Sequence, residues 1–118
     1  MDQQLVAALI AKVKALDEFV AIREEVAGFA EGTSLEDGVT AIRGVAPRLR
    51  EIAAMFPTDG IVGPSIKGLA ECYAITTSVD DSSLVEAEEE TQRDVNREEI
   101  DLLKELLALH GTDLKVKA

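Results

Sequence analysis

Apolar side chains recur every three or four positions through residues 3–31, and this spacing constrains the fold more than any other feature. One stripe of such residues consists of Leu5, Val6, Leu9, Val13, Leu16 and Val20. A period near 3.6 residues is typical of an amphipathic helix, whereas a half-buried strand alternates strictly between apolar and polar residues. The spacing therefore predicts one long N-terminal helix.

A second apolar stripe in the same segment consists of Phe19, Ile22, Val26 and Phe29. At a rotation of ~100° per residue, the two stripes do not fall on the same face of a helix. The helix is therefore expected to kink or to contact more than one neighbour. We expect this second stripe to form a face that binds a partner. The partner is either another protein or a second copy of the chain.

Three further segments complete the predicted fold. The second helix contains Pro47, which should kink or restart it. The Pro- and Gly-rich stretch "PTDGIVGP", residues 57–64, predicts a loop before a third helix. The last helical segment starts near Ser83 and is predicted to end at Gly111.

The composition favours helices over sheets. Apolar residues make up 47 % of the 118 residues, but aromatic residues make up only 3 %. A core of aliphatic side chains and alanine suits closely packed helices. We therefore predict an all-α fold, an antiparallel bundle of four to five helices with a long N-terminal helix. It forms a single domain over residues 1–111, followed by a short loose tail over residues 112–118.

The last helical segment is unusually acidic. Residues 80–101 contain ten acidic and two basic side chains. Between Glu88 and Glu99, Val95 is the only large apolar residue, so this part of the helix cannot bury a full apolar face. We expect the segment either to project from the bundle or to break near Asn96, which could cap a new helix.

The acidic side chains have one structural and two functional interpretations. In the structural interpretation they form a solvated helix face, which the helix dipole and i,i+4 pairs stabilise. In the first functional interpretation, an acidic surface binds a basic protein partner. The residues of this surface are Glu88, Glu89, Glu90, Asp94 and Glu98. In the second, carboxylates bind a divalent metal, because hard cations prefer oxygen ligands. The candidate ligands are Glu86, Glu89, Glu90 and Asp94.

The spacing of two carboxylate pairs bears on the metal hypothesis. Glu86 with Glu89 has E-x-x-E spacing, and Glu98 with Asp101 has E-x-x-D spacing. This resembles the paired motifs of all-helical nucleotide pyrophosphohydrolases of the MazG type. In that family the pairs lie on separate facing helices, whereas here they lie on one segment without basic groups placed for phosphates. Membership of the family is therefore not inferred.

Charge and residue counts disfavour several other functions. A net charge of −11 repels nucleic acids and anionic membranes, so direct binding to either is not expected. His110 and Cys72 are the single histidine and cysteine, which excludes an ordinary zinc site and an intramolecular disulfide. No cofactor is expected. No basic leader or membrane-length apolar run is evident, so the cytoplasm is the expected location.

The leading hypothesis is therefore a non-enzymatic acidic helical module for protein–protein interaction. Such a protein acts as an adaptor, a chaperone-like binder or a component of an assembly, and a homo-oligomer is expected. The alternative is a divalent-metal-dependent all-α phosphohydrolase that uses the carboxylates of the last segment. An enzyme is the less favoured class.

Overall fold

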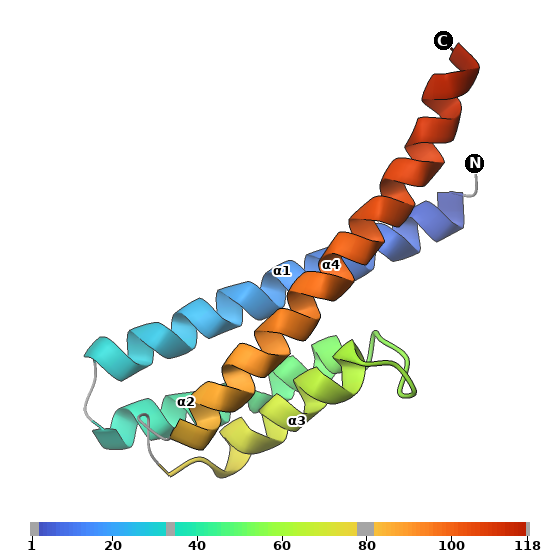
Figure 1. Ribbon diagram of the computed structural model, residues 1–118. Helices are drawn as coiled ribbons and strands as arrows, with labels where there is room; N and C mark the ends of the chain where they lie inside the picture. The colour runs from blue at the N-terminus through green and yellow to red at the C-terminus, as the bar shows by residue number, and fades with distance from the viewer. Residues whose placement is uncertain (1–2, 33–34, 78–81, 118) are drawn as a thin grey trace.

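The computed structural model describes residues 3–32, 35–77 and 82–117, and these residues form four helices (Figure 1). The helices are α1 (Gln3–Gly32), α2 (Leu35–Ala53), α3 (Val62–Ile75) and α4 (Ser82–Lys117). No strand occurs in these described residues. The predicted all-α bundle with a long N-terminal helix is confirmed, with four helices in the described part of the chain.

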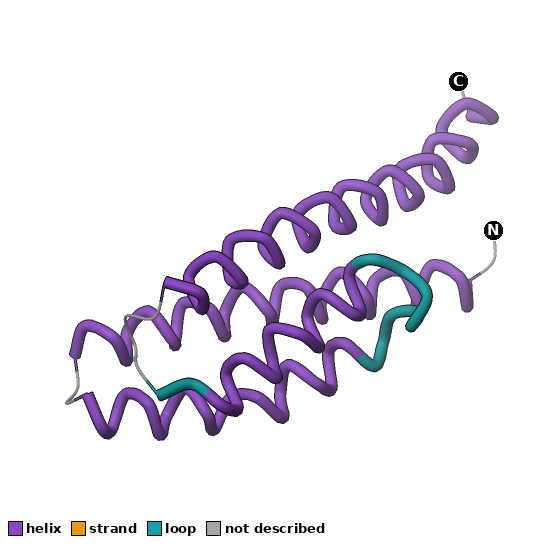
Figure 2. Tube along the Cα trace, turned by 60° about the horizontal axis from the view of Figure 1, so that its bottom comes forward, coloured by secondary structure: helices purple, strands orange, loops and turns teal. Residues whose placement is uncertain are grey.

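Successive helices run in opposite directions, as Figure 1 shows. Each helix packs against two others: α1 and α3 each contact both α2 and α4. The closest pairing is between α2 and α3, which are joined by the loop drawn in teal at the right of Figure 2. This is the up-down-up-down arrangement of a four-helix bundle, which short connections favour.

The core lies where all four helices overlap, and its side chains are aliphatic apart from Tyr73 and two phenylalanines. Its largest fully buried members are Tyr73, Phe19, Leu16, Ile22, Ile42, Leu49, Ile66, Leu69 and Val95. Members of both apolar stripes of α1 belong to this core. The two stripes diverge because α1 packs against two helices, α2 and α4, as the helical wheel predicts.

Pro47 does not restart the second helix, because α2 continues through it without interruption. Proline inside a helix removes one backbone hydrogen bond and crowds the preceding turn. Here the residues on either side of the proline hold both turns against the core. Ala46 and Leu49 are both fully buried.

The last helix neither breaks near Asn96 nor ends at Gly111, so both of these sequence predictions are wrong. Asn96 accepts a hydrogen bond from the side chain of Gln92 one turn earlier (2.8 Å), and it lies next to the fully buried Val95. These contacts favour a continuous helix over a new cap. Glycine in a helix costs about 1 kcal/mol relative to alanine, which is too little to end α4 by itself.

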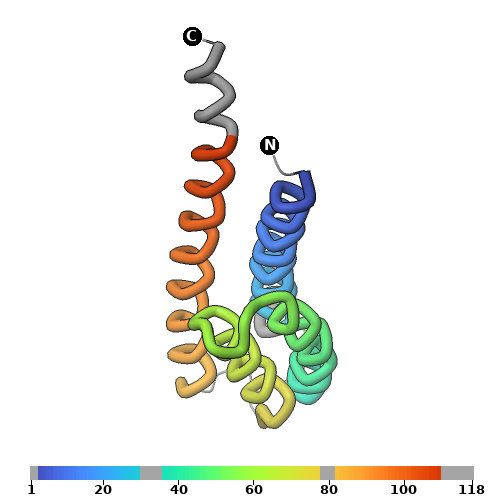
Figure 3. Tube along the Cα trace, turned by 90° about the vertical axis from the view of Figure 1, so that its right-hand side faces the viewer, coloured from blue at the N-terminus to red at the C-terminus, as the bar shows by residue number. Residues whose placement is uncertain are grey.

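The molecule is elongated, with extents of 58 × 29 × 21 Å and a radius of gyration of 16.9 Å. A compact domain of this length has a radius of gyration of about 13–14 Å. Figure 3 shows the cause, because α1 and α4 extend well beyond the shorter α2–α3 hairpin. We call residues 3–14 of α1 and 100–109 of α4 the α1/α4 arm.

Candidate interaction surface

The acidic part of α4 packs on α1 and α3 through polar contacts. Tyr73 Oη donates a hydrogen bond to Glu88 Oε2 (2.8 Å), and Arg23 Nε lies 3.8 Å from the same oxygen. Arg23 also donates through Nη1 to Gln92 Oε1 (2.9 Å). Burial, reinforced by the negative charge of Glu88, raises the pKa of the Tyr73 hydroxyl, so this group stays protonated as a donor.

A second group of polar contacts joins α4 to the start of α3. Ser65 Oγ donates to Asp94 Oδ2 (2.8 Å), and the Thr91 hydroxyl lies 3.4 Å from the Ser65 carbonyl oxygen. Thr91 is buried, like Val95 one turn later. The scarcity of large apolar residues in this stretch is therefore explained within the chain, since paired polar groups occupy much of its inner face.

These contacts divide the predicted acidic surface into two sets. Glu88 and Asp94 bind side chains of α3, so their carboxylates are engaged inside the bundle. Glu89 and Glu90 are exposed, and Glu98 is partly exposed. Only this second set faces outward.

The four candidate metal ligands do not converge. Glu86, Glu89 and Glu90 are exposed, whereas Asp94 is partly buried and accepts the hydrogen bond from Ser65. Across the described parts of the chain, no three His, Cys, Asp or Glu side chains are grouped so that they could hold a metal ion. The helical spacing of the carboxylates therefore does not translate into a ligand cluster.

The apolar face expected to bind a partner lies inside the bundle. Phe19 and Ile22 are completely buried, Val26 is buried, and Phe29 packs partly buried against the same core. This differs from the sequence expectation because helices of the same chain cover the face. It is not available for docking in this structure.

One ion-pair site on the outside of the bundle joins α1 to α2. The Arg48 guanidinium donates hydrogen bonds to Glu18 Oε1 and Glu25 Oε2, both at 2.6 Å. The two carboxylates raise the pKa of this guanidinium. Sequence reasoning missed this site. The available signal was the seven-residue spacing of Glu18 and Glu25, which places both on one face of α1.

Asp17 of α1 and Glu99 of α4 form a carboxyl pair next to the arm. The pKa of Glu99 is raised above its ordinary value, first by burial and then by the neighbouring charge of Asp17, with which it shares a hydrogen bond. Two acidic groups side by side disfavour full ionisation. The two carboxyl groups therefore interact more favourably when Glu99 carries its proton than when both groups are ionised.

The α1/α4 arm carries most of the large apolar side chains that the described structure leaves exposed. They are Leu5 (45 % exposed), Ile10 (41 %), Ile100 (53 %), Leu103 (43 %) and Leu107 (69 %). The other exposed members of this class, Met55, Ile61, Ile75 and Val85, are spread over α3, the loop before it and the start of α4. Scattered apolar residues are ordinary on a surface, but a cluster on one element marks an interaction site.

The large apolar residues that α4 exposes within the arm form a stripe with helical spacing. Ile100, Leu103 and Leu107 follow one another at steps of three and four, about 120° around the helix from the buried Val95 and Leu102. We call these three residues the α4 stripe. A shallow groove lies beside Ile100, and its other lining residues are Arg93, Asn96, Arg97, Asp101 and Lys104.

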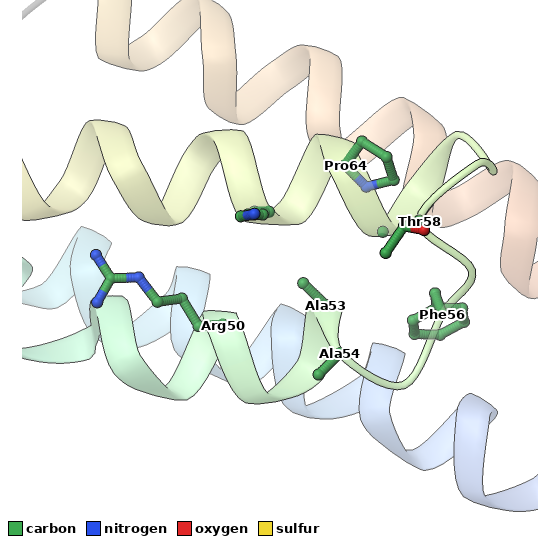
Figure 4. A pocket seen from close by; sticks show the side chains of 8 residues that line it. Arg50, Ala53, Ala54, Phe56, Thr58 and Pro64 are labelled. Atoms are coloured by element: carbon green, nitrogen blue, oxygen red, sulfur yellow. The ribbon is translucent and has the colours of Figure 1, made fainter.

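A cavity of about 440 Å³ lies between the end of α2 and the start of α3. Its lining residues are Arg50, Ala53, Ala54, Phe56, Thr58, Gly63, Pro64 and Lys67, most of which Figure 4 labels. The lining is largely apolar, with exposed cationic side chains at Arg50 and Lys67. Nothing else at this cavity points to a ligand.

Comparisons with known proteins give no relative. No protein-family model matches the chain, and neither a curated protein nor a solved structure matches it. Within the described residues, no helix is both long and apolar enough to cross a membrane. Any assignment of function therefore rests on the surface described above.

Proposed function

We propose that this protein is a non-enzymatic helical interaction module whose docking surface is the α1/α4 arm. The observation that carries the proposal is the exposure of Ile10, Ile100, Leu103 and Leu107 on the two helices that extend past the α2–α3 hairpin (Figure 3). Binding is favoured by about 25 cal/mol for each Å² of apolar surface that a partner removes from water.

The spacing of the α4 stripe favours a helical partner. An amphipathic helix presents anchors at i, i+3 and i+7, and a second helix fits its ridges between them. Ile100, Leu103 and Leu107 have this spacing within the continuous helix α4. Adaptors, chaperone-like binders and assembly components all use surfaces of this kind.

The acidic surface plays a secondary part in the proposal. Glu89 and Glu90 are exposed on the first half of α4, where they would attract a basic partner and accelerate its association. Surface charges of this kind change association rates more than binding free energies. The alternative of a metal-dependent phosphohydrolase has no such support, because its candidate ligands Glu86, Glu89, Glu90 and Asp94 do not converge.

Site-specific photo-crosslinking tests the proposal in extracts of the source cells. A p-benzoyl-phenylalanine is placed at position 107 on the arm or, as the control, at position 75 on α3, which is similarly exposed. We expect a discrete crosslinked product from position 107 and none from position 75. The crosslinked protein should then bind the purified chain, and Leu103→Glu should abolish that binding. Equal products from both positions would contradict the proposal.

A further inference from the structure

The net negative charge of the chain is confined to the part of the sequence outside the arm. Residues 15–99 contain nineteen acidic and seven basic side chains, a net charge of −12. Residues 1–14 and 100–118, which include the arm, contain four acidic and five basic side chains, a net charge of +1. The arm is thus nearly neutral, like residues 35–77, which carry five acidic and four basic side chains. Unlike those residues, the arm carries most of the exposed large apolar side chains.

This distribution decides how two copies of the chain can approach each other. The acidic bodies repel at short range, whereas the arms do not. Contact through the arms, with the two bodies pointing away from each other, brings apolar surfaces together and keeps the acidic parts far apart. An antiparallel, two-fold arrangement satisfies both conditions, and it is the commonest symmetry of homodimers.

The shape of the arm also favours a second copy of the chain as the partner. A pair of helices has one face without cover, and two such pairs packed together form a four-helix bundle. We infer that the partner of the α1/α4 arm is a second copy of this chain, so that two arms assemble into an intermolecular four-helix bundle. This inference rests on the proposed function, since it names the occupant of the same surface.

Sedimentation equilibrium of the purified chain tests the inference. We expect the apparent mass to rise with concentration from the chain mass of 12.7 kDa towards twice that value. The double variant Leu103→Glu/Leu107→Glu should weaken the dimer at least about tenfold, because it replaces two interface side chains with charges. The control, Ile61→Glu/Ile75→Glu, adds the same two charges at exposed apolar sites outside the arm and should leave the dissociation constant unchanged.

The possible outcomes separate this inference from the proposed function. A monomer at every concentration overturns the inference, and so does a dimer that responds equally to both double variants. If the chain is monomeric but position 107 still crosslinks to another protein, the interaction module stands and the second copy is excluded. Helical circular dichroism and a thermal melt of each variant establish that it is folded. Wild-type dimerisation with selective loss in the arm variant supports the inference.

Discussion

Tyr73 donates a hydrogen bond to Glu88 Oε2 across 2.8 Å, and this contact joins the core face of α3 to the most acidic part of α4. Tyr73 is fully buried, and Glu88 retains 14 % of its side-chain exposure. Arg23 approaches the same carboxylate from α1. Three helices thus meet at one carboxyl group, which explains why a helix with so few apolar residues packs in the bundle.

Removing the hydroxyl should destabilise the bundle. Tyr73→Phe keeps the packed ring but leaves the Glu88 carboxylate without its donor, and hydrogen bonds to charged groups contribute about 1.5–3 kcal/mol. We expect the free energy of unfolding, measured by urea denaturation, to fall by about that amount. Glu88→Gln retains an acceptor for the hydroxyl and should cost less. A Tyr73→Phe variant as stable as the wild type would show that the contact does not hold α4.

The single apolar anchor in the middle of α4 gives a second prediction. Val95 is fully buried, and Val95→Ala should lower the free energy of unfolding by roughly 2 kcal/mol through lost burial and a residual cavity. Val85 lies on the same helix but is 44 % exposed, so Val85→Ala is the matched control, with a change within about 0.5 kcal/mol. Equal effects of the two substitutions would mean that α4 is not packed as described.

Two glycines of α3 should respond oppositely to alanine. A Cβ atom at Gly63 would lie 3.0 Å from the Pro57 carbonyl oxygen and 3.3 Å from the Phe56 Cβ, whereas nothing lies within 4 Å of one at Gly68. Gly68→Ala should stabilise the protein by about 0.5–1 kcal/mol through helix propensity. Gly63→Ala gains the same propensity but forces backbone atoms apart, which costs about 1–3 kcal/mol.

The measurement for this pair is the thermal midpoint of each variant. Gly68→Ala should melt above the wild type, and Gly63→Ala should melt below it. A midpoint for Gly63→Ala above that of the wild type would contradict the close approach of the Pro57 loop to α3.

The Glu99–Asp17 pair predicts a pH dependence. The pKa of Glu99 in the folded protein is raised above its ordinary value of 4.5, so the folded state holds this proton more tightly than the unfolded state does. The contribution of Glu99 to stability is therefore most favourable below pH 4.5 and is lost as pH rises through the folded-state pKa. Glu99→Gln keeps a neutral side chain at every pH. It should raise the melting temperature at pH 7, and the gain should disappear near pH 4.

Thermal melts of the wild type and of Glu99→Gln across this pH range check the prediction. Glu98→Gln, at the neighbouring position, controls for the removal of one negative charge from α4. If the two variants gain the same stability at pH 7, the effect belongs to net charge rather than to the pair.

Much of the fold was predictable because helical periodicity reflects local geometry. The spacing from Leu5 to Val20 defined α1, and the Pro- and Gly-rich stretch marked the loop before α3. Length and neighbours were harder to predict, since they depend on tertiary contacts. Pro47 and Asn96 both looked like helix boundaries, but buried residues beside them keep α2 and α4 continuous.

The interaction surface was less predictable than the fold. The sequence showed that α1 has two apolar faces, but it could not show that Phe19 and Ile22 are covered by the chain's own helices. Leu102 and Leu106 of α4 pack in or against the core, whereas Leu103 and Leu107 are exposed. They divide because they lie on different faces of the helix, and which face the other helices cover is a property of the assembled bundle.

Hydrogen exchange of the wild-type chain, followed by mass spectrometry at low and at high protein concentration, tests the central claim most directly. If the α1/α4 arm associates with a second copy, amide protection in residues 3–14 and 100–109 will rise with concentration, while protection of α2 and α3 will stay the same. Identical protection of the arm at all concentrations, or a rise confined to α2 and α3, would contradict the claim that copies meet through this surface.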